Sequence, residues 1–206
     1  MDINGVCGVI SDITRKINEK KDYLTELDNI IADGDHGINM ARGFTAVNDK
    51  LPALADKDIG TVLKTVGMTI VSQVAGTAGP LYGTAFMRAG MIVGAKSSID
   101  IITFAECLNA AIEGVMARGK SAEGEKTMLD AMIPAYRAIK QSADGGHSAK
   151  EALAAGVKAA WEGVEYTKTI AATKGRASYI GERSIGHQDP GATSFAYILQ
   201  CVAEAV

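Results

Sequence analysis

The sequence predicts an all-α fold of about eight amphipathic helices, packed as an antiparallel bundle or a closed helical barrel. Apolar residues recur every three or four positions through most of the 206 residues, and no stretch alternates with a period of two. Apolar residues make up 47% of the chain but aromatic residues only 5%. The core must therefore consist of Ala, Val, Ile, Leu and Met, which favours closely packed helices over sheets.

Helix boundaries follow from the apolar stripes and from residues that begin or end helices. The stripe of the first helix, for example, consists of Val6, Ile10, Ile13 and Ile17. The expected helices span, approximately, residues 3–20, 37–51, 58–74, 84–95, 103–117, 127–139, 148–164 and 192–204. A short segment at residues 23–27 leads into an acidic loop over residues 28–37. The connections are short, which favours antiparallel neighbours.

Local motifs refine several of these elements. Thr103 with Glu106, and Ser148 with Glu151, have the spacing of a capping box at a helix start. Pro134 lies inside a helical pattern, where we expect a kink. Residues 173–191 form the longest connection and show no period. A long connection without regular structure is usually functional in a compact domain, and we interpret this one as a lid.

Composition and charge exclude several classes of function. The net charge is −3 with no long basic run, which argues against nucleic acid as a partner. No stretch approaches the roughly 18 consecutive apolar residues of a membrane span. The three cysteines, Cys7, Cys107 and Cys201, are far apart and have no metal-ligand spacing, which is typical of reduced core residues. We expect a single cytoplasmic domain over residues 1–206 without a signal peptide.

The most informative stretch is residues 28–39, in which three carboxylates fall within eight positions. Asp33 and Asp35 flank Gly34, His36 follows at once, and Asp28 precedes them. Carboxylates this close repel one another, and a bound cation is the usual way to keep them all ionised. Oxygen ligands favour Mg²⁺, which commonly shares its shell with phosphate oxygens. A metal-phosphate site is the first hypothesis; a polar turn in which Asp33 or Asp35 caps the next helix is the alternative.

Two other motif matches fail on their context. Residues 114–121 fit the P-loop expression, but they come late in a helical pattern and no strand precedes them. The plainer interpretation is a helix C-terminus with Gly119 as its cap. Residues from Asp33 onward begin like an EF-hand loop, but the sixth position is Ile38 and the twelfth is Phe44, so the pattern fails.

Several blocks, in this order, resemble the DhaL family of nucleotide-binding dihydroxyacetone kinase subunits. They are residues 27–28 with 33–40, residues 79–84, and residues 175–176, 179–181 and 189–193. Together these blocks cover essentially the whole chain, and their combination is specific to the family. The resemblance implies an eight-helix antiparallel barrel with ADP or ATP bound at one end, and two Mg²⁺ ions held by Asp28, Asp33 and Asp35.

The resemblance also implies roles for individual residues. Arg176, on the expected lid, would join the three aspartates in phosphoryl transfer. Ala78 stands where the family often has a serine, so a hydroxyl contact is in doubt there and a backbone N–H would have to serve. The residues expected beside the nucleotide are His36, Gly37, Ile38, Asn39, Thr77, Ala78, Gly119, Met128, Arg176, Asp189, Pro190 and Gly191.

The activity that the resemblance implies is phosphoryl transfer through Mg²⁺-bound ADP/ATP to dihydroxyacetone. In the family, a DhaK subunit holds the sugar and a DhaM phosphocarrier of the phosphotransferase system recharges the nucleotide. Two alternatives stay open at this point: a standalone subunit that exchanges free ATP, and a regulatory module that senses ADP. The oligomeric state is also open, with a homodimer as one alternative.

Overall fold

The computed structural model describes all 206 residues, and the prediction of an all-α fold is confirmed. The only β-type pairing is an isolated bridge between Asp2 and Ser98. No helix is both long and apolar enough to cross a membrane. The α-helices are α1 (Ile3–Glu19), α2 (Lys21–Ile31), α3 (His36–Asn48), α4 (Ile59–Gln73), α5 (Ala78–Val93), α6 (Ile101–Gly119), α7 (Leu129–Asp144), α8 (Ala149–Thr167) and α9 (Pro190–Glu204). Three 3₁₀ helices complete the chain: η1 (Leu51–Leu54), η2 (Arg176–Tyr179) and η3 (Gly181–Ser184).

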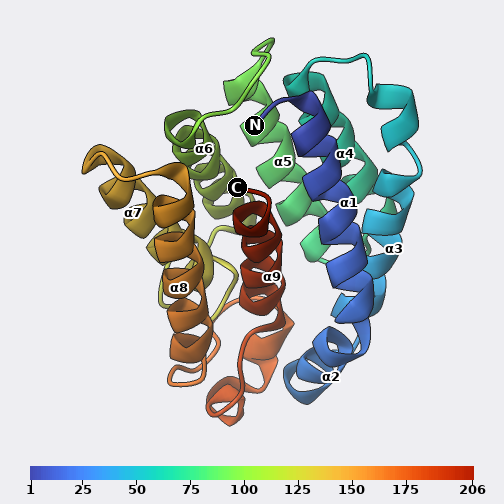
Figure 1. Cartoon of the computed structure of the whole chain (residues 1–206). Coiled ribbons are helices and arrows are strands. Elements are labelled where there is room, and N and C mark those ends of the chain that lie inside the picture. The colour runs from blue at the N-terminus through green and yellow to red at the C-terminus, as the bar shows by residue number, and fades with distance from the viewer.

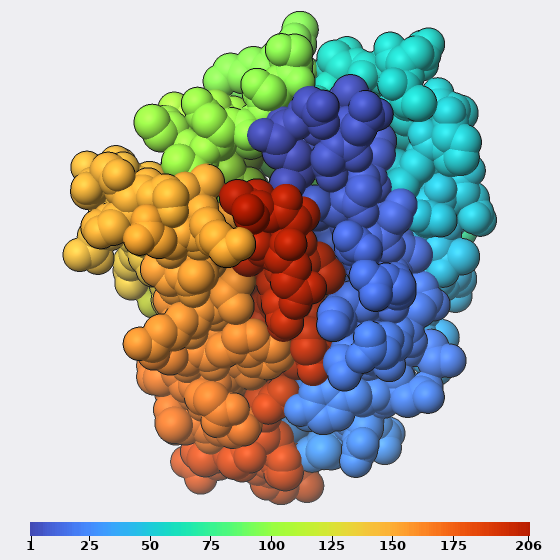
Figure 2. Space-filling model, in the orientation of Figure 1, coloured from blue at the N-terminus to red at the C-terminus, as the bar shows by residue number.

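Eight of the helices form a closed ring. From α3 to α9 each helix packs against the next one in the chain, α1 packs against α3, and α9 returns to α1. Figure 1 shows this arrangement, with α9 between α8 and α1. In the space-filling view the red C-terminal helix fills the seam between the orange and blue segments (Figure 2). The ring is therefore closed at this seam by contact between the first and last helices.

Successive helices of the eight-membered ring run in opposite directions, which decides where the connections lie, and the short α2 lies at the end of the barrel where α1 finishes (Figure 1). The two chain termini lie toward one end of the barrel, together with the connections that follow α3, α5 and α7 (Figure 1). The connections that follow α2, α4, α6 and α8 lie at the opposite end. Four segments that are far apart in sequence are thereby brought to one end of the molecule.

The interior is aliphatic, as the composition predicts. One cluster of 43 buried residues includes members of all nine α-helices. Val6, Ile10, Ile13 and Ile17 of α1 are all buried, which confirms the predicted stripe. Burial of each such side chain contributes about 1.5–3 kcal/mol, so this packing rather than helix propensity dominates the stability of the barrel.

Small residues bring α4 and α5 into close contact. A Cβ atom at Gly67 of α4 would lie 2.6 Å from the carbonyl oxygen of Gly83 in α5. The reverse holds as well, since a Cβ atom at Gly83 would lie 2.8 Å from the Gly67 oxygen. About two turns before Gly67 in α4, Gly60 donates its backbone N–H to the Gly94 oxygen at 3.1 Å. At these glycine positions the two helices leave no room for a side chain.

The clearest difference from the sequence prediction is α2. Residues 23–27 were expected only to lead into an acidic loop that starts at Asp28, but the helix continues to Ile31. Leu24, Leu27 and Ile31 are buried along one side of it, and they attach α2 to the barrel. The prediction failed because this helix has only 11 residues and its last turn contains polar side chains.

Other local predictions had mixed outcomes. The capping box of Ser148 and Glu151 is confirmed, but the one proposed at Thr103 is wrong, because Asp100 caps α6 and accepts the Thr103 N–H. Helix α6 ends at Gly119, and Lys120 rather than Gly119 adopts the left-handed cap conformation. Helix α7 continues through Pro134 and ends at Asp144. The α8–α9 connection (residues 168–189) is not structureless, because it contains η2 and η3.

The contact between α4 and α5 generates a stability prediction. Gly67→Ala places a methyl group against backbone atoms that cannot move independently, so we expect a loss of about 1–3 kcal/mol in the free energy of unfolding. Gly8→Ala is the matched control, because Gly8 is exposed on α1 and a Cβ atom there meets nothing within 4 Å. It should leave stability unchanged or raise it by up to about 1 kcal/mol. Urea denaturation of both variants measures the difference, and equal midpoints would contradict the prediction.

The N-cap of α4 generates a prediction about pH. Asp58 accepts hydrogen bonds from the Thr61 hydroxyl at 2.7 Å and the Thr61 N–H at 2.8 Å, and these bonds hold its pKa below the ordinary value. A lowered pKa in the folded state means that the ionised cap stabilises the protein above about pH 4, and that this contribution is lost as the pH falls through the lowered pKa. Asp58→Asn should therefore lose less stability than the wild type between pH 5 and pH 3, measured by thermal unfolding.

Candidate functional site

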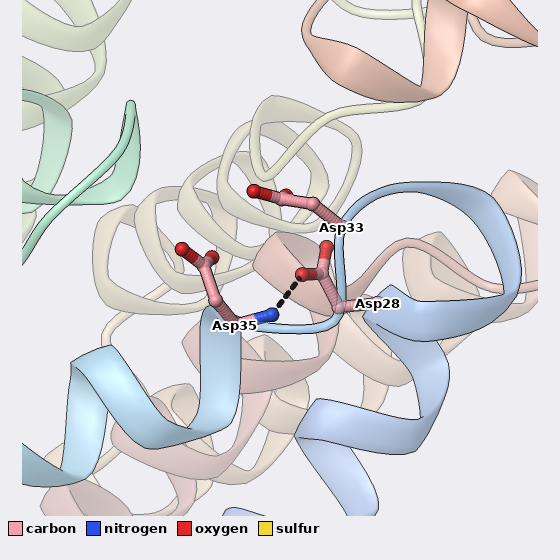
Figure 3. A group of neighbouring side chains, drawn as sticks. All are labelled: Asp28, Asp33 and Asp35. Atoms are coloured by element: carbon pink, nitrogen blue, oxygen red, sulfur yellow. Dashed lines mark hydrogen bonds between the residues drawn. The ribbon is translucent and has the colours of Figure 1, made fainter.

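The three predicted aspartates converge at the end of the barrel that holds the connections after α2, α4, α6 and α8. Asp28 lies in the last turn of α2, and Asp33 and Asp35 lie in the turn between α2 and α3. One carboxylate oxygen of each lies within 4.8 Å of the others (Figure 3). Gly34, between the latter two, has φ +72°, which an L side chain rarely adopts, so glycine permits this sharp turn.

Asp28 is the buried and oriented member of the cluster. Its Oδ2 atom accepts the backbone N–H of Asp35 at 2.8 Å, drawn in Figure 3, and that of His36 at 3.1 Å. These are N–H groups at the start of α3, where a helix has free donors and a positive dipole end. The start of α3 therefore fixes Asp28 and offsets part of its negative charge, while Asp33 stays exposed and Asp35 is half-buried.

The α8–α9 connection brings a positive charge to the same place. Arg176, the first residue of η2, forms an ion pair with Asp33, with 2.7 Å between Nη1 and Oδ2. Both side chains keep partial contact with solvent, at 55% and 34% exposure. The ion pair therefore adds little stability, but it places the guanidinium directly over the acidic cluster.

A cleft of about 450 Å³ lies beside the cluster and contains most of the predicted nucleotide-contacting residues. Its walls come from all four connections at this end of the barrel and from the adjoining helix ends. The predicted residues that line it are Asp28, Asp33, Asp35, His36, Thr77, Ala78, Gly119, Met128, Arg176, Asp189, Pro190 and Gly191.

Three predicted residues do not line this cleft. Gly37 is buried where α3 meets α2, and a Cβ atom there would collide with the backbone oxygen of Lys21. Ile38 is 50% exposed on the outer side of α3. Asn39 is buried and accepts a hydrogen bond from Arg42, while its own amide nitrogen has no partner. Gly37 thus has a packing reason to be glycine, whatever its relation to a ligand.

The cleft also contains residues that sequence reasoning did not single out as site residues. Among them are Gly76, Tyr82, Ser121, Lys126 and Thr127. Tyr82 lies within residues 79–84, one of the blocks that carry the family resemblance, and Gly76 lies in the connection between α4 and α5. Ser121 to Thr127 belong to the connection after α6, which lacks a recognisable motif, so only the fold brings it to the site.

Buried hydrogen bonds connect the site to the helices behind it. The Nε2 atom of His36 lies 2.9 Å from the Ser194 hydroxyl, which lies 2.7 Å from the Tyr82 hydroxyl. Tyr82 also donates to the Gly191 carbonyl at 3.1 Å. Burial lowers the pKa of His36, which favours the neutral ring. These bonds hold the starts of α3 and α9 together beneath the cleft.

The pKa of Asp189, at the start of α9, is raised above the ordinary value of an aspartate. Burial raises its pKa to about 7, although the Ala192 N–H, which it accepts at 2.6 Å, favours the ionised form. The nearby carboxylates of Asp130 and Asp28 contribute to this rise, and the Lys126 ammonium opposes it. The carboxylates at this end of the barrel therefore influence the pKa of Asp189, which is not one of the three clustered aspartates.

The donor set suits a hard divalent cation with phosphate. Three carboxylates supply oxygen ligands only, and the adjoining cleft leaves room for further ligands from a bound molecule. A P-loop does not form at this site, because residues 114–119 are the last turns of α6.

Known proteins resemble this chain along nearly its full length. The sequence model of the DAK2 domain matches residues 30–204. The chain is 47% identical, over 186 residues, to the Escherichia coli (strain K12) protein named PEP-dependent dihydroxyacetone kinase, ADP-binding subunit DhaL, covering 90% of this chain and 89% of that protein. It is 40% identical to the ADP-binding subunit DhaL of the PTS-dependent dihydroxyacetone kinase of Lactococcus lactis, covering 96% and 94%.

Longer kinases contain a similar region. An L-erythrulose kinase of Pectobacterium atrosepticum is 35% identical over 182 residues, but the chain spans only 31% of its length. The crystal structure of a dihydroxyacetone kinase from C. freundii, in complex with AMP-PNP and Mg²⁺, superposes with a TM-score of 0.76 at 24% identity. It covers 98% of this chain, which spans 34% of that one, and supports the fold. Given the match over residues 30–204 and the close relatives of equal length, this chain belongs to the DAK2 domain family.

Proposed function

We propose that this chain is the nucleotide-binding subunit of a dihydroxyacetone kinase, a phosphotransferase. In this proposal ADP/ATP stays bound with two Mg²⁺ ions, and phosphate passes to dihydroxyacetone on a DhaK subunit. A DhaM phosphocarrier then recharges the ADP. The names of the close relatives, which are ADP-binding subunits of PEP- or PTS-dependent kinases, support this donor. The three cysteines form no disulfide, which is typical of a protein in a reducing compartment such as the cytoplasm.

The observation that carries the proposal is the convergence of Asp28, Asp33 and Asp35 under Arg176 at the mouth of the cleft. These carboxylates would hold the Mg²⁺ ions, which when bound neutralise phosphate charge and align the transferred group. Asp28 is already oriented by two N–H donors, so binding needs little rearrangement of its side chain. Arg176 would exchange its contact with Asp33 for the phosphate charge and help to exclude water.

The remaining cleft residues have proposed roles in holding the nucleotide. Gly119 and Met128 would border the adenine and ribose, and Thr77 and Ala78 form the opposite wall at the start of α5. At Ala78 a backbone N–H at the helix start would take the place of a hydroxyl donor. Residues 189–191 would close the far side. Residues 36–39 would lie beside the phosphates, although Gly37, Ile38 and Asn39 do not line the cleft.

The acceptor sugar would be held by DhaK. The chain spans 34% of the length of the dihydroxyacetone kinase from C. freundii, which leaves room in such longer kinases for a sugar-binding half. Some relatives are named erythrulose kinases, so a different short ketose is the closest alternative substrate. Because DhaK and DhaM would have to reach the same cleft, the two partners would dock in turn at this end of the barrel.

Replacement of one carboxylate tests the metal assignment. Asp33→Asn keeps the size of the side chain but removes a charged ligand, so affinity for ADP in the presence of Mg²⁺ should fall about 100-fold, roughly 3 kcal/mol. Asp22→Asn is the control, since Asp22 lies on the surface of α2 next to the site but does not line it. Isothermal titration calorimetry measures both. Unaltered Mg²⁺-dependent binding by Asp33→Asn would rule out the assignment.

The donor is tested by following the nucleotide. In a reaction with labelled phosphoenolpyruvate, the general phosphotransferase proteins, DhaM and DhaK, we expect one ADP to stay bound through many turnovers while the label reaches dihydroxyacetone. Native mass spectrometry of the recovered protein measures its occupancy. Rapid exchange with free ATP and activity without DhaM would instead support the standalone enzyme. Retained ADP binding without any phosphoryl transfer would support an ADP-sensing module.

A further inference from the structure

Lys126 is a buried cation that the proposed chemistry does not use. It lies in the connection after α6, is 1% exposed and has φ +60°, a conformation that costs energy for a residue with a side chain. Burial lowers the pKa of its ammonium group, because the charged form loses water. A buried ammonium persists in a fold only when its hydrogen bonds are satisfied by the protein.

Three backbone carbonyls satisfy the Lys126 ammonium. Its Nζ atom donates to the oxygens of Thr167, His187 and, at 3.3 Å, Ile170. Thr167 is the last residue of α8, so its carbonyl has no partner within the helix and belongs to the negative end of the helix dipole. An ammonium has three protons, and all three are used here, so none is left for a phosphate.

The three carbonyls belong to the two ends of the α8–α9 connection that carries Arg176. Thr167 and Ile170 lie where the connection begins, and His187 lies where it returns to α9. The two ends also bond to each other, through Gly186 N–H to the Lys168 oxygen at 2.7 Å. The neighbouring Glu125 oxygen accepts the Thr173 N–H at 3.3 Å. Lys126 therefore joins the base of this connection to the segment after α6.

The segment after α6 is itself a wall of the cleft. Ser121 and residues 126–128 line it, and so does Arg176. Any motion of the base of the α8–α9 connection would change the position of Arg176 relative to Asp33, with which it pairs at 2.7 Å. Lys126 is thus a direct and buried link between the wall of the cleft and the segment that carries Arg176.

We propose that Lys126 is a positioning residue that ties both ends of the α8–α9 connection to the cleft wall, holds Arg176 over the acidic cluster and so slows the escape of a bound nucleotide. The inference rests on the proposed function, because it concerns the retention of Mg²⁺-bound ADP in this cleft. It assigns Lys126 an effect on how long the nucleotide stays, and no direct contact with it.

The rate of ADP dissociation tests this inference. The full chain is loaded with a fluorescent N-methylanthraniloyl-ADP and Mg²⁺, and the label is displaced with excess ADP in a stopped-flow instrument. Lys126→Met should release the nucleotide about tenfold faster, since it removes charged hydrogen bonds that hold the connection in place. Lys168→Met is the matched control, because Lys168 is in the same connection but pairs with Glu165 at 2.7 Å and does not line the cleft. An unchanged rate for Lys126→Met would overturn the inference.

A double-mutant cycle separates positioning from general destabilisation. Arg176→Ala should accelerate dissociation in the wild-type background, but should add little to Lys126→Met, because both changes remove the same guanidinium from its place. Multiplicative effects would show that Lys126 does not act through Arg176 and would overturn the inference. Hydrogen exchange of residues 168–188 should also be faster in Lys126→Met than in Lys168→Met.

A second variant covers the case in which Lys126→Met does not fold. Lys126→Gln keeps a polar donor without the charge, and it should give an intermediate dissociation rate; a wild-type rate would again overturn the inference. Failure of the proposed function is distinguishable, because then the wild-type protein would bind no labelled ADP in the presence of Mg²⁺. Wild-type binding with unaltered rates in both variants would reject the role of Lys126 alone.

Discussion

The repulsion among three carboxylates is the constraint on which the organisation of this site depends. Asp28, Asp33 and Asp35 offer oxygens within 4.8 Å of one another, and the fold surrounds them with compensating groups. The N-terminus of α3 supplies two N–H donors to Asp28, and Arg176 pairs with Asp33. These N–H groups and Arg176 do not form a buried salt bridge with the aspartates, so some carboxylate oxygens stay free to accept a cation. The backbone N–H groups of Asp35 and His36 thus orient Asp28, and Arg176 pairs with Asp33.

The closed barrel makes this compensation possible, because it brings distant segments to one end. The aspartates follow α2, Arg176 follows α8, and the cleft walls follow α4 and α6. Close contact between α4 and α5, with glycines facing each other, draws in one side of the ring, and α9 packs against α1 to close it. Rigid helices therefore carry a site that is composed almost entirely of their connections. The His36, Ser194 and Tyr82 hydrogen bonds extend that rigidity to the floor of the cleft.

In the proposed function, retention and release of a nucleotide would place opposite demands on the α8–α9 connection. It would have to cover the acidic cluster and still let partner proteins reach the phosphates. Within it, Arg176 and the 87% exposed Tyr179 face solvent, whereas Ala177 is buried and packs with Ile31 of α2 and with Ala172. Its ends are bonded to each other and to Lys126. The connection is therefore held at its base by hydrogen bonds and in its middle by apolar packing, and in the proposed function both would keep Arg176 beside the acidic cluster.

The sequence by itself determined the helical class, most of the helix positions and the acidic cluster, because apolar periodicity and neighbouring carboxylates are local properties. It did not predict α2 as a helix, since an 11-residue segment has weak propensity and Leu24, Leu27 and Ile31 form it only by packing on the barrel. It also placed Gly37, Ile38 and Asn39 beside the ligand, where the structure shows packing against α2, an outward side chain and a buried amide. The pairing of Arg176 with Asp33 and the hydrogen bonds of Lys126 join residues more than 40 positions apart. Only the tertiary structure decided them, because such contacts depend on which helix ends meet, and local sequence patterns do not encode that.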